Sequence, residues 1–461
     1  MKTRTEQDSM GAVQVPDHGL WGAQTQRAVE NFPISGIRFP RAFVEATALF
    51  KKGAAEFNVE SKRLDDKVGR AIIEAAQEVI DGKWDEHFPV DVFQTGSGTS
   101  FNMNMNEVLS NVAIEKLGGQ RGSKKPVHPN DHVNMGQSSN DIFPSSAHLA
   151  VLIALKRQFA PAVEKLEKSL QKKGKEFDGV VKLGRTHLMD ALPVRLGQEF
   201  GGYARQIARA REEVRRASEC LTEVALGGTA VGTGMNAFPG YAKAVCAKVA
   251  RWSGIPIREA ENHFEAQGAR DDLVTVSGAL KRLACALMKI ANDIRWMGSG
   301  PAGGLGEILI PDLQPGSSIM PGKVNPVMCE VVTQVSAQVI GNDAAVAIGG
   351  QGGQFELNVM IPVMAINVLD SIKLLSSASG AFAEKCVDGI TANEERCREL
   401  AEQSNMLVTA LAPILGYDRA AALAKEALKK RKTVRQLALE QGAVTEEQAK
   451  KVFDLRGMTG P

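Results

Sequence analysis

The sequence predicts a mainly α-helical protein, and three observations support that prediction. Aromatic residues make up 5% of the 461 positions, while hydrophobic residues, dominated by alanine, leucine and valine, make up 44%. This balance favours helices packed on helices over a sheet-rich fold. Two long segments place apolar residues at alternating intervals of three and four. The glycine-rich segments at 227–234 and 349–354 follow no strand of a βαβ pattern, so they do not indicate a nucleotide-binding fold.

The two periodic segments predict the longest helices. A spacing that averages 3.5 residues is typical of long helices that lie side by side at shallow angles. The first run follows Phe200, and its positions are Tyr203, Ile207, Ala210, Val214, Ala217, Leu221 and Val224. The second consists of Leu273, Val276, Leu280, Leu283, Leu287, Ile290, Ile294 and Met297.

Weaker helical patterns complete the organisation of the chain. They occupy about 41–80, 102–117, 141–176, 327–347, 362–386 and 393–412. We expect a mixed, mostly helical N-terminal domain over 1–138, a central long-helix bundle over 139–391 and a small helical domain over 392–461. Helices of this length expose more apolar surface than one chain easily covers. A homo-oligomer is therefore expected.

Composition excludes several classes of partner. The net charge is +2, and no basic stripe is interleaved with aromatic residues, so nucleic-acid binding is not expected. The basic run at 429–432 is interpreted as a solvated helix face. Six scattered cysteines are typical of free thiols in a reducing compartment. With no apolar leader at the start and no run of about 18 apolar residues, we expect a cytoplasmic protein without a membrane partner.

Four polar segments interrupt the helical patterns. They are GSGTSFNMN at 96–104, GQSSND at 136–141, GRTHLMD at 184–190 and GSSIMPGKVNP at 316–326. Each places hydroxyls or amides ahead of an apolar-periodic stretch, where helix N-termini attract carboxylates and phosphates. Capping explains each segment taken singly, and Asn325 before Pro326 is predicted to be an N-cap. Four segments of one composition favour a shared anion site.

Other kinds of chemistry find no support. The one H-x-x-x-H pair, His128 and His132 in HPNDH, is joined by no further histidine or cysteine, so neither a metal site nor a cofactor is expected. No serine lies in G-x-S-x-G, which argues against an α/β-hydrolase.

The polar segments together resemble the fumarase/aspartase superfamily of lyases. GSSIMPGKVNP is similar to its signature, and further similar motifs follow in order along the chain: DSMGAVQVP, LWGAQTQRA, QTGSGTSFNMNMNE, HPNDHVNMGQSSND, GRTHLMDALPVRLGQEF and ALGGTAVGTGMN. The resemblance implies a three-domain fold whose central helices assemble into a tetrameric core. It also implies that polar segments from three subunits meet in each active site.

Two positions divide the superfamily. Aspartases have glutamine where this chain has His187, and alanine where it has Gly322. Both residues resemble the metal-independent class II fumarases, which interconvert fumarate and L-malate. The chain departs from the commonest pattern at Met135-Gly136, where a polar pair is frequent, and at Ile361, where a basic residue is frequent. Neither departure removes a residue assigned to chemistry.

The resemblance also implies roles for individual residues. Ser317 is the base, ionised with help from Lys323 and the N–H groups of its loop. His187, with Glu330 as acidic partner, handles the hydroxyl side through a water molecule, and imidazole suits such a proton relay. The other substrate-binding positions are Ser97, Thr99, Ser138, Ser139, Asn140, Thr186, Ser318, Lys323 and Asn325. A second anion site corresponds to His128, Asn130 and Asp131, for which a proline-stabilised turn is an equal alternative.

Two other functions remain open at this stage. One is ammonia-lyase activity on aspartate, which the superfamily also includes. The other is a non-catalytic structural role, which the complete set of Ser317, Lys323, Asn325, His187 and Glu330 argues against.

Overall fold

The computed structural model describes residues 2–460, and it is mainly helical as predicted. The chain forms two compact units that alternate along the sequence. Unit 1 takes in the chain up to Pro161 together with Glu212–Arg282 and Ala337–Ser376, and unit 2 takes in Ala162–Arg211, Leu283–Ser336 and the chain from Ser377 onward. The three-domain division expected from the sequence stays a prediction, because it follows chain order whereas these units interleave.

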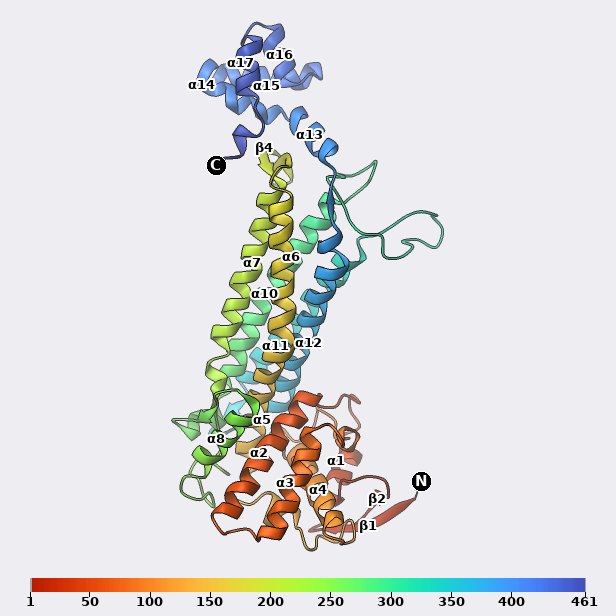
Figure 1. Cartoon of the computed structure of the whole chain (residues 1–461), viewed down its shortest axis with the longest axis vertical. Helices are drawn as coiled ribbons and strands as arrows, with labels where there is room; N and C mark the ends of the chain where they lie inside the picture. The colour runs from red at the N-terminus through yellow and green to blue at the C-terminus, as the bar shows by residue number, and fades with distance from the viewer. Residues whose placement is uncertain (1, 461) are drawn as a thin grey trace. The chain divides into compact units, whose positions relative to one another are not determined.

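Unit 1 is a layer of helices with small hairpins at its surface (Figure 1). In unit 1, α2 packs on α3, α5 and α8, and α3 on α4. Phe39, which precedes α2, forms its aromatic centre together with the phenylalanines of α2, α4 and α5, and the ring centroids of Phe39 and Phe43 lie 4.3 Å apart. Its elements are β1 (Thr3–Asp8), β2 (Gly11–Pro16), α1 (Ala23–Asn31), α2 (Arg41–Glu60), α3 (Asp66–Ile80), α4 (Thr99–Lys116), the helical turn η2 (Pro129–Val133), α5 (Ser139–Ala154), β5 (Glu223–Val224), α8 (Tyr241–Ser253), β6 (Arg258–Glu259), α9 (His263–Gly268), β8 (Gly353–Gln354) and β9 (Leu357–Asn358).

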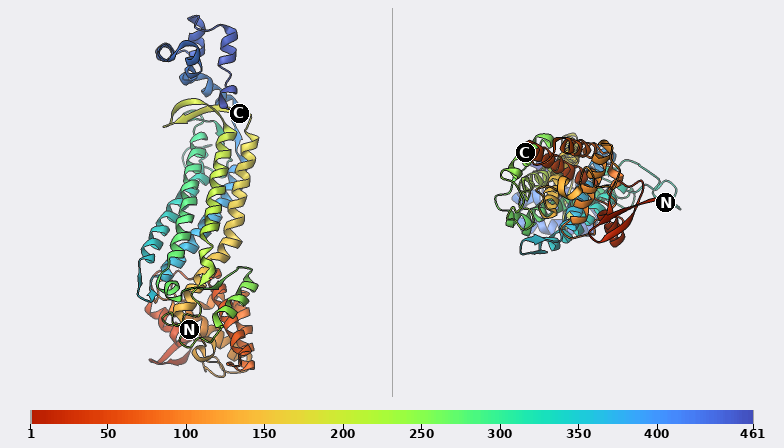
Figure 2. Two further views of the ribbon diagram at one scale, coloured as in Figure 1. Left: turned by 90° about the vertical axis from the view of Figure 1, so that its left-hand side faces the viewer. Right: turned by 90° about the horizontal axis from the view of Figure 1, so that it is seen from below.

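Unit 2 holds an antiparallel hairpin and the C-terminal helices, which have an apolar core of their own. The hairpin lies across the ends of α6 and α7 in Figure 2. The elements are β3 (Val181–Thr186), β4 (Met189–Arg195), β7 (Ile308–Leu309), β10 (Thr391–Ala392), α13 (Glu394–Gln403), α14 (Ala412–Leu415), α15 (Tyr417–Lys430), α16 (Val434–Glu440) and α17 (Glu446–Val452).

Five long helices contribute residues to both units. They are α6 (Ala160–Glu176), α7 (Leu196–Ala217), α10 (Asp271–Met297), α11 (Val327–Gly350) and α12 (Ile361–Lys385). Every position of the second predicted run is at most 4% exposed in α10, as the 3.5-residue period requires. The first run was predicted too long. Helix α7 ends at Ala217, and Leu221 and Val224 belong to a short turn and to β5.

One segment, Ile361–Gly389, is long and apolar enough to cross a membrane on length and composition alone. The sequence had been expected to contain no such segment, and that expectation was wrong. Its most apolar stretch has a mean hydropathy of 1.3, and 67% of that stretch is buried within the protein. The core helix of a soluble protein meets the same criteria, so the segment is weak evidence for a span.

Candidate active site

The donor cluster of unit 1 is formed where α4 and α5 begin. Thr99 is the first residue of α4 and Ser139 the first of α5, and their hydroxyl oxygens lie 2.7 Å apart. The Ser97 hydroxyl extends this row of hydrogen-bonded hydroxyls and lies 2.9 Å from that of Thr99. Two helix N-termini therefore present hydroxyls and the positive ends of their dipoles to one place. This is the arrangement that a carboxylate prefers.

Ser138 and Asn140 complete this cluster, and a buried carboxylate holds them. Ser138 Oγ accepts a hydrogen bond from Asn140 N at 3.2 Å, and Ser138 N donates to Asp141 Oδ1 at 2.9 Å, which closes a capping box. The other oxygen of Asp141 accepts from Gly227 N and Thr229 N, both at 3.0 Å. Burial raises the pKa of the Asp141 carboxyl, and the three N–H donors lower it by a smaller amount. The S-x-x-D pattern was the sequence signal for this residue, and it was overlooked.

A buried lysine supports the same segment. Lys51 Nζ donates to Asn134 Oδ1 at 3.0 Å and to Gln137 Oε1 at 2.8 Å, within the stretch that leads from η2 to Ser138. The Lys51 side chain is fully buried, and burial lowers its pKa to about 7. No sequence signal marks this residue, because a lysine in a helical pattern is ordinarily solvated.

Both departures from the family pattern adjoin segments of the donor cluster. Met135 O accepts from Asn58 Nδ2 at 3.3 Å, and Gly136 has a φ of +76°. Ile361 is fully buried, and its N–H donates to Gly96 O at 3.2 Å.

The turn η2 holds the residues assigned to a second anion site. His128 Nδ1 accepts from Asn130 N at 3.3 Å and from Asp131 N at 3.2 Å, so the imidazole caps the turn. It also lies 3.4 Å from Asp131 Oδ2. The structure therefore brings the three residues together, and these contacts are those of a capped turn.

In unit 2, His187 occupies the tip of the β3–β4 hairpin. Thr186 pairs with Met189, which leaves His187 and Leu188 as a two-residue turn with φ values of +57° and +60°. A type I′ turn requires positive φ at both positions and favours Asn-Gly there. Holding other residues in that region costs on the order of 1–3 kcal/mol each. The histidine is therefore presented on a strained turn and is exposed to solvent.

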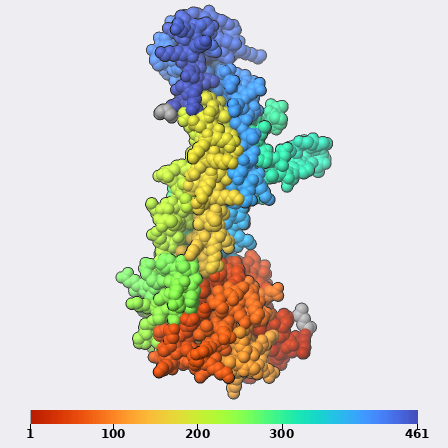
Figure 3. Space-filling model, viewed as in Figure 1, coloured from red at the N-terminus to blue at the C-terminus, as the bar shows by residue number. Residues whose placement is uncertain are grey.

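The segment GSSIMPGKVNP forms an exposed loop of unit 2 and belongs to the lobe that stands clear of the helices in Figure 3. Ser317 Oγ accepts hydrogen bonds from Ile319 N at 3.3 Å and Met320 N at 3.1 Å. Gly316 N donates to Lys323 O, and Asn325 Nδ2 donates to Gly316 O, both at 2.7 Å. The prediction of Asn325 as an N-cap was therefore wrong, because its side chain closes the neck of the loop.

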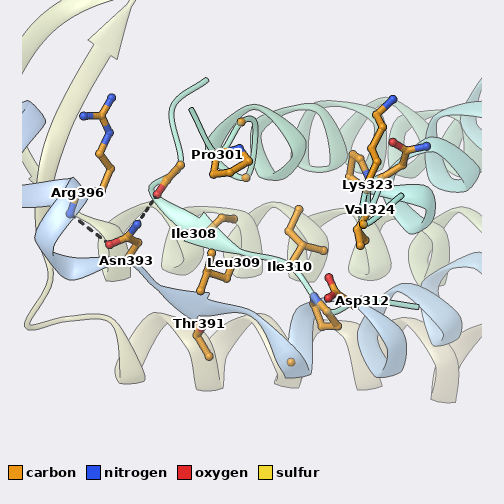
Figure 4. Close-up of a pocket in the computed structure, with 18 residues that line it drawn as sticks. Pro301, Ile308, Leu309, Ile310, Asp312, Lys323, Val324, Thr391, Asn393 and Arg396 are labelled. Atoms are coloured by element: carbon orange, nitrogen blue, oxygen red, sulfur yellow. Dashed lines mark hydrogen bonds between the residues drawn. The ribbon is translucent and has the colours of Figure 1, made fainter. Parts of the chain in front are cut away.

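A cavity of about 740 Å³ lies beside this loop (Figure 4). Gly322–Pro326 form one wall, Ile308–Ile310 form the floor, and Lys323 and Arg396 lie at opposite ends.

Glu330 lies in the first turn of α11 and is partly buried. Among residues 2–460, no hydrogen bond or ion pair joins it to His187. In the same range, no group of three or more His, Cys, Asp or Glu side chains is placed to hold a metal ion.

The site residues therefore fall into separate groups. Unit 1 brings together Ser97, Thr99, Ser138, Ser139 and Asn140, while unit 2 holds the Thr186–His187 turn, the Ser317 loop and Glu330. Sequence reasoning missed Asp141, Lys51 and a buried carboxylate beneath the hairpin, Glu307, which accepts from Arg185.

Comparisons with known proteins agree with the resemblance. A family model described as Lyase matches residues 11–341, and one described as Fumarase C C-terminus matches residues 407–460. The chain is 55% identical to a class II fumarate hydratase of Corynebacterium glutamicum, covering 99% of this chain and 96% of the relative. It is 52% identical to the mitochondrial fumarate hydratase of Homo sapiens, over 99% and 90% respectively. A crystal structure of recombinant class II fumarase from Schistosoma mansoni, 38% identical, covers both chains completely with a TM-score of 0.97.

Proposed function

Because the chain belongs to the class II fumarate hydratase family of lyases, we propose that it catalyses the reversible hydration of fumarate to L-malate. In the dehydration direction, a base removes a proton from the carbon next to one carboxylate of malate. The electron pair moves into that carboxylate and gives a doubly charged aci-carboxylate. Expulsion of hydroxide from the neighbouring carbon, as water once protonated, then gives fumarate. The protein must supply the base, donors for the developing charge and an acid for the departing oxygen.

Ser317 is the proposed base, and one observation carries this assignment. Its Oγ accepts hydrogen bonds from Ile319 N and Met320 N within the loop. Two aligned N–H donors favour an alkoxide over a neutral hydroxyl, because hydrogen bonds to an ionised acceptor are about twice as strong. Lys323 supplies a cation on the same loop.

His187 and Glu330 are the proposed proton relay for the hydroxyl side, acting through a water molecule. The helix N-termini that carry Thr99 and Ser139 hold one substrate carboxylate, together with Ser97, Ser138 and Asn140. Thr186, Ser318, Lys323 and Asn325 are the remaining proposed substrate contacts. His128, Asn130 and Asp131 are proposed as a second anion site, and their capped turn remains the alternative.

A homotetramer is the proposed assembly, with each active site drawing on three subunits. Helix α11 supports it, because Val331, Ile340 and Ile348 are 41%, 36% and 63% exposed on one chain. Apolar residues on an exposed helix face mark a surface that another chain covers. We also propose that the enzyme is cytoplasmic and needs no metal ion or cofactor.

The reaction is tested by incubating the purified protein with fumarate in water, with fumarate plus ammonia, and with fumarate plus a chelator. Malate should form in all three. Aspartate formation would instead support an ammonia-lyase, loss of activity in chelator would refute independence of metal, and no product in any arm would support a structural role. Ser317→Ala should abolish turnover while the oligomer stays intact, and unchanged activity would refute the assigned base.

The shared site is tested by mixing two inactive variants. Ser317→Ala and His187→Asn homo-oligomers are dissociated, combined in equal amounts and reassembled. If the two residues of one site come from different subunits, random pairing leaves about a quarter of the sites with both native residues. Activity should then return toward that fraction. If both residues come from one subunit, no site is repaired and the mixture stays inactive.

A further inference from the structure

The turn that carries His187 has little support of its own. Positive φ at a two-residue turn suits Asn and Gly, and the turn here is His187-Leu188. Packing does not hold the turn either, because the side chains of Leu188 in the turn and of Met189 after it are 73% and 70% exposed. A strained conformation persists only where its surroundings determine it.

The hairpin ladder is also too short to fix the turn. Pairing shifts register between Leu183 and Arg185, which leaves two residue pairs, Arg185–Asp190 and Thr186–Met189, before the turn. At the shift, a Cβ on Gly184 would come within 2.4 Å of Leu192 O, so the strands approach too closely there for a side chain. The bulge therefore separates the tip from the regular part of the hairpin.

Beneath this bulge lies a buried carboxylate. Glu307 is fully buried, and Arg185 Nη1 donates to both of its oxygens, at 2.9 and 3.0 Å. Lys182, 2% exposed, lies 3.4 Å from Glu307 and 3.0 Å from Glu199. Two cations of β3 are thus held against two carboxylates from outside the strand.

Glu307 is itself firmly anchored. Its N–H donates to Met297 O at 2.8 Å, and its carbonyl accepts from Asn393 N at 2.9 Å and from Cys397 Sγ at 3.4 Å. Because the backbone N–H and carbonyl of Glu307 are both hydrogen-bonded, its carboxylate can set the position of the arginine that bonds to it. Arg185 is two residues from His187, on the turn side of the bulge.

We propose that Glu307, acting through Arg185, is a positioning residue that holds the His187 turn in the geometry needed for proton relay. This inference rests on the proposed hydratase function. The pair acts on the orientation of the imidazole, and among residues 2–460 neither of its side chains forms a hydrogen bond or ion pair with an assigned substrate contact, although Thr186 follows Arg185 in the chain. Its loss should therefore reduce the chemical step more than substrate binding.

Glu307→Gln tests this role, because it keeps the size of the side chain and removes the charge that holds Arg185. A misplacement of about 1 Å can cost roughly a hundredfold in rate, so kcat should fall roughly tenfold to a hundredfold with KM little changed. Glu45→Gln is the matched control. Glu45 pairs with both terminal nitrogens of Arg157, at 2.8 and 2.9 Å, and within residues 2–460 neither forms a hydrogen bond or ion pair with an assigned site residue. Its kcat should equal that of the unmodified protein.

Leu188→Gly separates positioning from a general loss of stability. Glycine adopts positive φ without steric cost, so it favours the native turn when the anchor is gone. In the Glu307→Gln background, Leu188→Gly should restore most of the lost kcat, and it should not restore a merely unstable fold. Hydrogen exchange of the amides of 183–190 should quicken in Glu307→Gln and slow again in the double variant. If Glu307→Gln does not assemble, Arg185→Lys replaces it with the same expectations.

The outcomes distinguish the two proposals. If the unmodified protein does not hydrate fumarate, the proposed function fails, and the exchange measurements alone then decide on the anchoring of the turn. If the protein is active and Glu307→Gln behaves as Glu45→Gln does, the positioning role is overturned. Failure of Leu188→Gly to restore either kcat or exchange protection also overturns it.

Discussion

Lys51 gives the protein a stability that should rise with pH. The amine is fully buried and bonded to two neutral amides, Asn134 and Gln137. Among residues 2–460 it forms no ion pair, and the charge of the buried Asp141 carboxylate opposes the effect of burial on the lysine pKa only in part. Burial lowers its pKa from 10.5 to about 7. Between these values, the unfolded chain holds a proton on this amine that the folded chain has lost. Unfolding therefore takes up a proton in this window, and raising the pH favours the folded state because it binds fewer protons.

The magnitude follows from linkage. The free energy of unfolding should rise by about 1.4 kcal/mol for each pH unit in the window, which amounts to roughly 5 kcal/mol across it. Lys51→Met removes the titrating group while keeping its length, so the difference between the unmodified protein and this variant isolates the effect. Below about pH 7, both the folded and unfolded chains carry the charge, and the difference should level off.

Urea unfolding at one protomer concentration, at pH values from about 6 to 10, measures this difference. The difference curve should slope upward for Lys51→Met. It should stay flat for the control Lys52→Met, whose partly exposed amine bonds to Gln77 Oε1 at 2.9 Å. Parallel stability curves for the unmodified protein and Lys51→Met would refute the reasoning, because they would show that the amine titrates alike in both states.

Three further substitutions test the polar segments and the assembly. Asn325→Ala removes the donor to Gly316 O together with a proposed substrate contact, so kcat should fall roughly tenfold and KM should rise, whereas an unchanged KM would show that the amide closes the loop without binding substrate. Asp141→Asn places an amide nitrogen against backbone N–H donors, which should lower the free energy of unfolding in urea by about 1–3 kcal/mol and raise KM. Ile348→Asp puts a charge on the exposed face of α11, so sedimentation should show smaller species without turnover, and an active tetramer would contradict the proposed interface.

The helical architecture could be predicted because periodicity records burial directly. Each position of the run from Leu273 to Met297 is buried, since a 3.5-residue spacing leaves one face of a helix apolar. The same pattern misled beyond Ala217. Leu221 and Val224 continue the spacing by coincidence, because the helix ends at Ala217 and these two residues belong to a short turn and to β5.

The donor residues could be predicted from type and position, but their supports could not. Ser138 and Thr99 precede or begin helices, where hydroxyls are expected. The supports depend on contacts that local sequence patterns do not reveal. Lys51 and Glu307 are buried against partners far away in the sequence, and Asn325 closes a loop although its position before Pro326 is typical of an N-cap. A buried lysine and a buried glutamate look like surface residues until their partners are known.

Each polar segment is held by its own support within its own unit. Asp141 and Lys51 hold Ser138–Asn140, Glu307 holds the His187 turn, and Asn325 closes the Ser317 loop. None of these supports needs another subunit, so the local geometry of each segment is set before assembly. In the proposed homotetramer, assembly would then bring these segments together without reshaping them. Subunits separated by Ile348→Asp should therefore lose turnover while hydrogen exchange at 183–190 and at 136–141 stays slow. Rapid exchange there would show that neighbouring subunits, and not these buried contacts, shape the segments.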